Sequence, residues 1–290
     1  MAARQTLFVN YLAMLLALAA HSVRAQESTE TDLGSLVHEL CDDEAARYTI
    51  TMPDGVALNR VPRSLLRWSK ATEGSAFGDT YIWTHQGCAE AIISIYAITS
   101  KRLINAEFQS LSDANFTLHR DGVKKWSPTE PGVKFRPIAG IRPPADSANA
   151  RLVQMNSIAR QFRADFSPHT APDDISRLRL LSKPLFRYES ENEEIIDGAL
   201  YGFVDSTDPE LLLVIEARST DAGSSWVYSP ARSRHDPLRL YYRDELVWDA
   251  PRLAPPWGNI RNPSKPYFNL QLAGLLPPGQ WQRIQEAIDR

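Results

Sequence analysis

The sequence predicts an α+β protein, mostly antiparallel β, built from two fused pseudo-symmetric helix-plus-sheet units that pack as one domain. The main observation is an internal repeat, because residues 65–97 match residues 185–217 without a gap at an offset of 120. A second observation is that each copy holds strands with an apolar face, which a single unit would leave open to water. The identical pairs are Leu65/Leu185, Arg67/Arg187, Glu73/Glu193, Gly78/Gly198, Tyr81/Tyr201, Glu90/Glu210, Ile95/Ile215 and Ala97/Ala217.

The N-terminus has the pattern of a secretory signal peptide over 1–25. Arg4 precedes an apolar run over 12–20, and Val23-Arg24-Ala25 places small residues at the −3 and −1 positions of a cleavage site. The run is too short to span a bilayer as a helix. We therefore expect a periplasmic or secreted chain that begins with a polar tail over 26–32 and has no stable membrane insertion.

The composition argues against nucleic acid or anionic lipid as a partner. The chain carries 32 Lys and Arg residues against 35 Asp and Glu residues, a formal net charge of −3 at pH 7. Its basic residues do not cluster along the sequence. We therefore expect no basic patch of the kind that binds nucleic acid or lipid headgroups.

The first unit is expected over 33–127. A helix should open it, because apolar residues recur there at helical spacing. Strands are expected over 64–69, 78–84 and 91–97, and the last is apolar on both faces, as in a central strand that is covered from two sides. Asp121-Gly122 predicts a tight hairpin turn. The apolar residues of the helix are Leu33, Leu36, Val37 and Leu40.

A stretch over 128–146 should link the units, and its five prolines make such a linker stiff. The second unit, over 147–250, repeats the order of elements. Its helix is predicted over 146–166 from a capping residue and an apolar stripe at steps of three and four. The last residues, 251–290, form another proline-rich crossing and a short helix. The stripe comprises Leu152, Met155, Ala159, Phe162 and Phe166.

The two cysteines, Cys41 and Cys88, are candidates for a disulfide in an oxidising compartment, and two free thiols are the alternative. The bond would tie the first helix to the turn before Ala91. It would be an addition to the repeated fold, because Cys88 corresponds to Asp208 in the second copy.

Four stretches resemble exported proteins of planctomycete bacteria that have no known activity. They read LLRWSKATEGSAFGDTYIWTHQG, EFQSLS, PLFRYE and DGALYGFVDSTDPELLLVIEAR. The resemblance extends from about Ser64 to Trp248. It implies a location in the cell envelope or outside the cell, and it transfers no catalytic residues.

No motif for a nucleotide, a metal or a nucleophilic serine is present in the sequence. There is no GxxxxGK[ST] or GxGxxG phosphate-binding pattern and no GxSxG turn. The histidines at positions 38, 85, 119, 169 and 235 lack the spacing of zinc ligands. We therefore expect no metal and no cofactor.

The charged pairs that both copies keep are Arg67/Arg187 and Glu90/Glu210. One interpretation is an ion pair between adjacent strands within each unit, which would set the strand register. The alternative is that the two Arg and two Glu residues gather around the pseudo-twofold axis and bind an anionic ligand there.

Two weaker candidates complete the set of possible functional residues. His85, Asp79 and Glu90 lie close to one turn and have the chemistry of an acid–base set, which only the first unit would hold. Trp257, in a loop-like stretch with two prolines and a glycine, is a candidate surface aromatic for ligand binding.

These observations favour a non-catalytic structural or binding protein of the cell envelope. The sequence supplies no nucleophile, metal set or paired carboxylates, so an enzyme is the less favoured interpretation. The alternative is a secreted hydrolase that acts from a cleft between the two repeat units.

Overall fold

The structure is a computed structural model that describes residues 33–71, 75–168, 171–190, 194–221, 223–277 and 279–289. The signal peptide and polar tail predicted over 1–32 lie outside the described residues, as do Glu73, Glu193 and His169. The described residues have an α+β architecture in which the strand pairings are antiparallel. Among them, no helix has the length and apolar character needed to cross a membrane.

The first unit begins with the expected helix, which lies over 33–45. Leu33, Val37 and Leu40 on this helix are buried, because they pack against the sheet that follows. The elements that come next are β1 (Tyr48–Thr51), β2 (Asn59–Arg60), β3 (Leu66–Lys70), β4 (Ala76–His85), β5 (Cys88–Ile98), the 3₁₀ helix η2 (Thr99–Lys101), β6 (Leu103–Ser110), β7 (Thr117–Arg120) and β8 (Val123–Trp126).

The second unit has the same order of helix and strands. It begins with α2 and continues through strands that alternate with tight turns. Its elements are α2 (Ala148–Ala159), β10 (Phe162–Phe166), β11 (Ser176–Leu180), β12 (Phe186–Tyr188), β13 (Ile195–Asp205), β14 (Asp208–Thr220), β15 (Gly223–Arg232), β16 (Leu238–Tyr242) and β17 (Glu245–Ala250).

The helix predicted over 146–166 is wrong in its second half. α2 ends at Ala159, after a start that Ser147 caps by accepting a hydrogen bond from the backbone N–H of Ala150. Phe162 and Phe166 belong to β10, which pairs with β11 on one edge and with β16 on the other. This pairing buries both rings and satisfies the backbone on both sides, so tertiary contacts override the helical spacing of the sequence.

The central hairpins of the two units have the same register at an offset of 120. β5 lies between β4 and β6 in a six-stranded sheet, and β14 lies between β13 and β15 in a nine-stranded sheet. Trp83 lies opposite Ala91, and Phe203 lies opposite Leu211. Both hairpins shift their register directly after that aromatic residue.

Gly78 and Gly198 each make room for an aromatic ring on the neighbouring strand. Trp68 lies opposite Gly78, and Tyr188 lies opposite Gly198. A Cβ atom built at either glycine would lie 2.4 Å from an atom of that ring. Such a distance is too short for any side chain, so the repeat retains glycine where a neighbour approaches closely.

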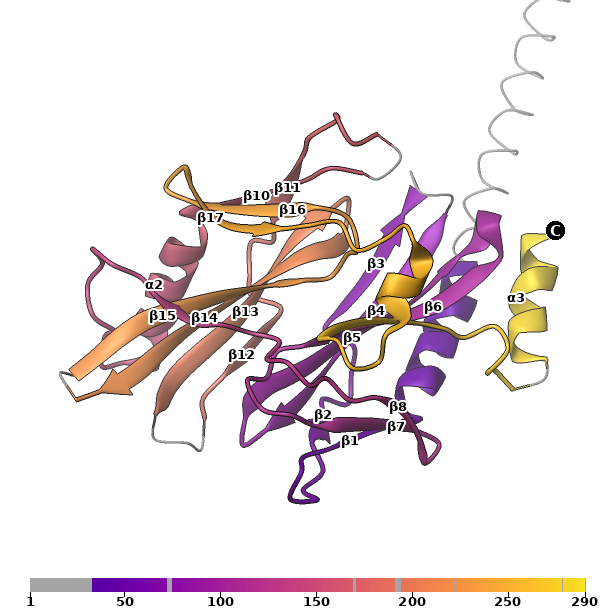
Figure 1. Ribbon diagram of the computed structural model, residues 1–290, viewed down its shortest axis with the longest axis horizontal. Coiled ribbons are helices and arrows are strands. Elements are labelled where there is room, and N and C mark those ends of the chain that lie inside the picture. Colours follow the sequence, from indigo (N-terminus) through magenta and orange to yellow (C-terminus); the bar gives the residue numbers. More distant parts are fainter. Residues whose placement is uncertain are drawn as a thin grey trace, which may run out of the picture.

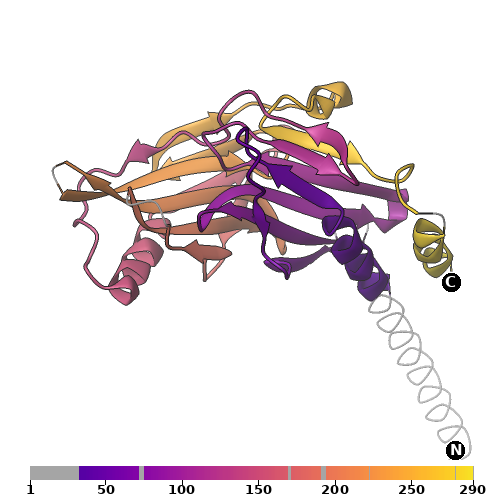
Figure 2. The same cartoon turned by 90° about the horizontal axis from the view of Figure 1, so that it is seen from below.

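Three apolar clusters divide the interior into layers. The first lies between the helix over 33–45 and one face of β4 and β5, and the second lies in the same way between α2 and β13–β14. The third lies between the two sheets, where Ile82 and Ile92 pack with Leu200 and Leu212. The sheets therefore face each other, and the helices lie at opposite ends of the molecule (Figures 1 and 2).

The prediction that 91–97 is a central strand covered from two sides is confirmed. Both faces of β5 are covered, one by the helix and one by the other unit. The odd-numbered residues of β5 and β14 that the repeat aligns are all fully buried: Ala91, Ile93, Ile95, Leu211, Leu213 and Ile215.

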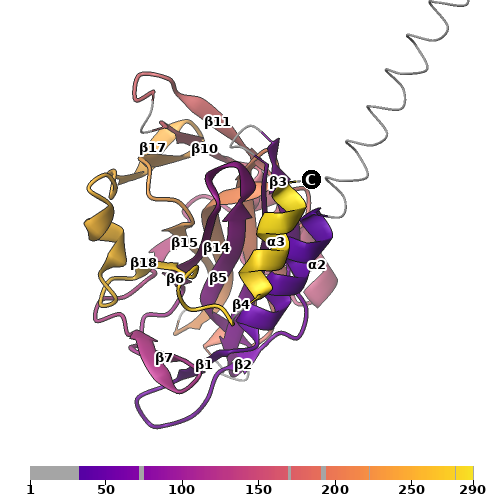
Figure 3. The same cartoon turned by 90° about the vertical axis from the view of Figure 1, so that its right-hand side faces the viewer.

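The two proline-rich segments add strands to the sheets that they connect. β9 pairs with β15 of the second unit, whereas β18 returns to the first unit and pairs with β6. The last helix, α3, lies beside the helix over 33–45 (Figure 3). The connecting elements are β9 (Arg136–Pro137), the 3₁₀ helix η3 (Trp257–Arg261), β18 (Tyr267–Gln271) and α3 (Gln280–Ile288).

Candidate functional site

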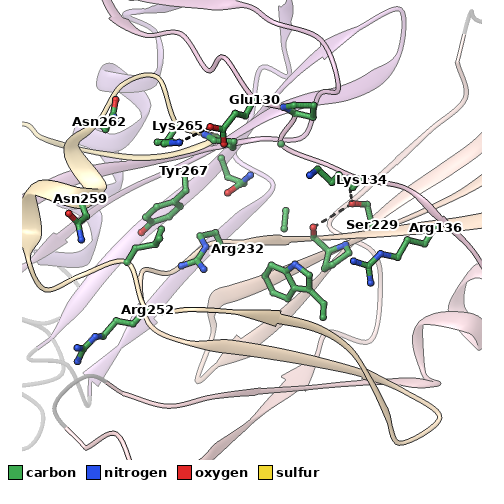
Figure 4. A pocket seen from close by; sticks show the side chains of 18 of the residues that line it. Glu130, Lys134, Arg136, Ser229, Arg232, Arg252, Asn259, Asn262, Lys265 and Tyr267 are labelled. Carbon is green, nitrogen blue, oxygen red and sulfur yellow. Dashed lines mark hydrogen bonds and ion pairs between the residues drawn. The ribbon is translucent and has the colours of Figure 1, made fainter.

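A pocket of about 760 Å³ lies at the junction of the two units (Figure 4). Its lining comes from β6 of the first unit, from β15 and β17 of the second unit, and from both connecting segments. One carboxylate and five cations line it, so its charge is strongly positive. The charged lining residues are Glu130, Lys134, Arg136, Arg232, Arg252 and Lys265.

The basic residues of the pocket do not cluster along the sequence, but the fold gathers them in one place. The five cations come from three segments that are far apart in the sequence, around positions 134, 232 and 252–265. Strand pairing of β9 with β15 and of β18 with β6 brings these segments to one place. The positions of the basic residues along the sequence therefore do not predict this group of cations.

Arg232 at the end of β15 is the buried cation of the pocket. It is 8% exposed, and its guanidinium donates to the backbone carbonyls of Arg234 at 3.1 Å and Pro251 at 2.9 Å. Among the described residues, no carboxylate lies within ion-pair distance of it. Burial lowers the pKa of Arg232, and Tyr267 and Asp236 oppose this only in part. An arginine remains charged at neutral pH, so the pocket holds a buried positive charge without an ionic partner.

One further polar atom in the pocket wall, the Gln109 Oε1, is buried without a hydrogen-bond partner in the described part of the chain. Tyr267 is also 4% exposed, and its hydroxyl lies near the carboxylate of Glu107. Burial and the nearby carboxylate of Glu107 raise the pKa of Tyr267, so its hydroxyl remains a donor. Unsatisfied buried groups of this kind are expected where a ligand or water completes the bonding.

The remaining cations are exposed and lie around the buried Arg232. Lys265 is neutralised by Glu130, whose carboxylate lies 2.6 Å from its ammonium (Figure 4). Lys134, Arg136 and Arg252 have no carboxylate within ion-pair distance among the described residues. The pocket can therefore attract and hold an anion. Within the same described part, no cluster of His, Cys, Asp and Glu side chains is arranged to hold a metal ion.

Arg67 and Arg187 form ion pairs within their own units, but not with the glutamates of the repeat. Arg67 contacts Asp79 on the adjacent strand at 3.2 Å and Asp42 on the first helix at 3.0 Å. Arg187 contacts Asp197 at 2.7 Å. These pairs lie on the helix-facing side of each sheet. The ion pairs described for Arg67 and Arg187 thus do not join them to Glu90 or Glu210.

Glu210 belongs to a buried ion-pair cluster between the two units. The ammonium of Lys70, which is 1% exposed, lies 2.7 Å from Glu210 and 2.8 Å from Asp205. Arg234 binds the same Glu210 oxygen at 2.7 Å. Burial lowers the pKa of Lys70, but Glu210 and Asp208 raise it by more, so the net shift is upward and the ammonium stays charged. This cluster joins a strand of the first unit to a hairpin of the second.

Among the described residues, no cation forms an ion pair with Glu90, the counterpart of Glu210. Burial raises its pKa to about 7, a hydrogen bond from Ser112 opposes the shift, and the carboxylates of Asp113 and Glu216 add to it. The shift indicates that Glu90 faces the second unit, because Glu216 lies there on β14. Glu90 does not line the basic pocket.

Replacing Glu90 with glutamine is expected to stabilise the protein at high pH. A carboxyl whose pKa is raised on folding holds its proton more tightly in the folded state, so its stabilising effect is lost as pH rises from about 4.5 to 7. Glu90→Gln should raise the free energy of unfolding by about 1–3 kcal/mol at pH 8 and change it little at pH 5. Urea titrations at the two pH values measure this, and an equal effect at both would contradict it.

The acid–base set of His85, Asp79 and Glu90 is not assembled in the fold. Asp79 is fully buried and binds His38 and Arg67 on the helix-facing side, whereas Glu90 faces the other unit. No hydrogen bond or ion pair described for these three residues joins one to another. Asp79 and Glu90 are close along the hairpin, but their side chains lie on opposite faces of the sheet.

Trp257, the candidate surface aromatic, is 46% exposed at the start of η3. Its ring packs edge-on against His235, with 5.0 Å between the ring centroids. Trp257 itself does not line the basic pocket, but its neighbours Gly258 and Asn259 do. The residue thus lies beside the site rather than in it.

The predicted disulfide between Cys41 and Cys88 is not formed. The Cys41 thiol donates to the backbone carbonyl of Ile95 inside the first unit, at 3.1 Å. The Cys88 thiol contacts the Ser190 hydroxyl of the second unit, also at 3.1 Å. The two sulfur atoms contact opposite faces of the same sheet, which explains why they cannot meet.

The most important residue of the pocket, Arg232, was missed from the sequence. Its equivalent by strand register is Ser110, since Ala91 pairs with Ser110 and Leu211 pairs with Arg232. The repeat therefore does not conserve it as an identical pair. A charged residue at the end of a buried strand was the only available signal.

In comparisons with protein-family models, with curated proteins and with solved structures, no match to this chain was found.

Proposed function

We propose that this chain is an exported, non-catalytic binding protein that holds an anionic small molecule in the pocket between its two units. The observation that carries the proposal is Arg232, a buried cation that lines the pocket, donates to two backbone carbonyls and has no carboxylate within ion-pair distance among the described residues. The pocket size lies within the range of small-molecule sites.

A bound anion would relieve the main electrostatic cost of the pocket. A buried charge without an ionic partner is unfavourable, and the fold holds Arg232 in place through two backbone carbonyls. An anion there gains charge-assisted hydrogen bonds from a guanidinium that is already oriented. The exposed cations Lys134, Arg136 and Arg252 add longer-range attraction.

The test is a calorimetric titration with inorganic phosphate and pyrophosphate. Arg232→Gln should weaken binding by about 10- to 100-fold, because it removes a charge-assisted contact of about 1.5–3 kcal/mol. Arg177→Gln is a matched control, since Arg177 is exposed on β11 and lies outside the pocket lining. Higher salt should weaken the wild-type interaction.

The proposal fails if wild type and Arg232→Gln bind these anions and longer acidic ligands equally weakly. Circular dichroism and thermal unfolding of Arg232→Gln without ligand show whether the variant is folded. If that variant does not fold, Arg252→Gln at the exposed rim replaces it and should weaken binding severalfold.

We also propose that the two units arose by duplication and are related by a pseudo-twofold axis. The common order of elements and the common register of the central hairpins support this proposal. Reciprocal contacts between the units support it further. Cys88 of the first unit contacts Ser190 of the second unit at 3.1 Å. By the offset of 120, Cys88 corresponds to Asp208 and Ser190 corresponds to Lys70. Lys70 and Asp208 also approach each other across the units, at 4.0 Å. Such reciprocity is the property of a twofold interface.

Export is the third part of the proposal. The signal-like pattern at the N-terminus supports it, as does the resemblance to exported planctomycete proteins. N-terminal sequencing of the mature protein should begin at or near Gln26. A mature protein that retains Met1 would contradict export by this route.

A secreted hydrolase is a second candidate, which one observation favours. Glu90 has a pKa of about 7, a value suited to a general acid or base at neutral pH. Its position outside the basic pocket weighs against this candidate. Hydrolysis of chromogenic glycosides or esters by the wild type that is lost in Glu90→Gln would favour it, and activity that Glu90→Gln retains would exclude this role.

A further inference from the structure

A network of polar groups begins at the pocket wall and continues into the interface between the two units. The Arg232 guanidinium lies over the ring of Tyr267, 5.9 Å from its centroid (Figure 4). The Tyr267 hydroxyl lies near the half-buried carboxyl of Glu107 on β6. Glu107 also accepts hydrogen bonds from Tyr96 of β5 at 3.1 Å and from Asn269 of β18 at 3.3 Å. Tyr267 therefore connects the pocket to Glu107.

Charged groups of the second unit face Glu107 from the other side of the interface. Glu210 and Asp208 on β14 disfavour a further negative charge there, whereas Arg234 favours it. Burial raises the pKa of Glu107 to about 7, Glu210 adds to this shift, and the two neighbouring tyrosines oppose it only in part. Glu107 is thus a group that gains or loses its proton near neutral pH.

The same network holds more carboxyls than cations. Lys70 and Arg234 both bind Glu210 at 2.7 Å. Even without Asp205, whose side chain is 36% exposed, four carboxyls share three cations among the described residues. An excess of negative charge in a buried place is costly, so one of the carboxyls retains its proton more readily than in water. The four carboxyls are Glu107, Asp208, Glu210 and Asp236, and the three cations are Lys70, Arg232 and Arg234.

We propose that anion binding in the pocket is coupled to protonation of Glu107, so that the protein binds its ligand more tightly as the pH falls through neutrality. This inference rests on the proposed anion-binding function. A negative charge at Arg232 disfavours a second one at Glu107, because only the side chain of Tyr267 separates the two places. The bound anion therefore raises the pKa of Glu107 further, and the complex takes up a proton. Because the coupling is reciprocal, the protonated protein has the higher affinity for the anion.

The test is a calorimetric titration of the full-length mature protein with sulfate at pH 6 and pH 8, at constant ionic strength. Sulfate remains a dianion over this range, so a change in affinity comes from the protein. Wild type should bind sulfate about threefold to tenfold more tightly at pH 6, since a coupled shift of one pKa unit corresponds to at most tenfold in affinity. Titrations at pH 7 in two buffers of different ionisation enthalpy should show net proton uptake.

Two substitutions assign the effect to Glu107. Glu107→Gln is uncharged at either pH and should bind sulfate at pH 8 about as tightly as wild type does at pH 6. Glu90→Gln is the matched control, because the pKa of Glu90 is also about 7 but this residue does not line the pocket. Glu90→Gln should keep the pH dependence of the wild type. Circular dichroism at both pH values shows whether each variant is folded.

Each outcome bears on the inference. Equal affinity of wild type at pH 6 and pH 8, or proton release on binding, overturns the coupling and leaves the anion site intact. A pH dependence that Glu107→Gln retains belongs to another group, such as His235, and overturns the role of Glu107. If Glu107→Gln does not fold, Tyr267→Phe replaces it and should move the midpoint of the pH dependence upward, because Tyr267 lowers the pKa of Glu107; an unchanged midpoint overturns the inference. Failure of sulfate to bind at both pH values overturns it as well, and if phosphate also fails to bind, the proposed function is wrong too.

Discussion

Replacing Lys70 with methionine is expected to destabilise the protein by about 3–5 kcal/mol. The Lys70 ammonium is buried between the units and contacts Glu210 and Asp205 at 2.7 and 2.8 Å. The uncharged side chain would remove one of the cations that bind Glu210 and would remove a cation that lies 4.0 Å from Asp208. Burial and Glu210 already raise the pKa of Asp208, so without Lys70 this carboxylate would ionise at a still greater cost.

Urea unfolding at pH 7 measures this effect, and a second substitution provides the control. The double variant Lys70→Met/Glu210→Leu removes both charges and should recover much of the loss, because a buried ion pair can be replaced by apolar side chains at small cost. A loss below about 1 kcal/mol for Lys70→Met would show that the cluster contributes no more than a surface ion pair.

Truncation of Ile95 or Ile215 to alanine is expected to cost about 2–5 kcal/mol in either unit. Both side chains are fully buried, and each lies at the same register position of the central strand beneath its own helix. If the units descend from one ancestor, the space around the two side chains should be alike. The two losses should therefore agree within about 1 kcal/mol.

Chemical denaturation of both variants tests this expectation, and Ile175→Ala serves as the control. Ile175 is 58% exposed, so its truncation should change the free energy of unfolding by less than about 0.5 kcal/mol. A large loss in one unit and a negligible loss in the other would show that the matching register does not imply matching packing.

The sequence predicted the central hairpins well, because their physical signals are local. Alternating apolar residues determine which face of β5 and β14 is buried, and tight turns place the paired strands next to each other. The gapless repeat then predicted that the hairpins are alike.

Features that depend on contacts distant in sequence were not predictable. The residues at 162–166 have helical spacing, but pairing with β11 and β16 makes them a strand. The pocket depends on β9 and β18, two short strands in proline-rich segments that showed no alternation. Lys70 and Glu210 are 140 positions apart, and only the packing of the two sheets brings them into contact.

The C-terminal segment returns to the first unit, so the sheet of that unit is completed only late in synthesis. β6 is made early, but its partner β18 (Tyr267–Gln271) appears only after the whole second unit. Until then, β6 presents an open sheet edge, and the first cluster lacks the cover that Ile284 of α3 supplies. The first unit therefore acquires its last edge strand only after residues 267–271 have been made.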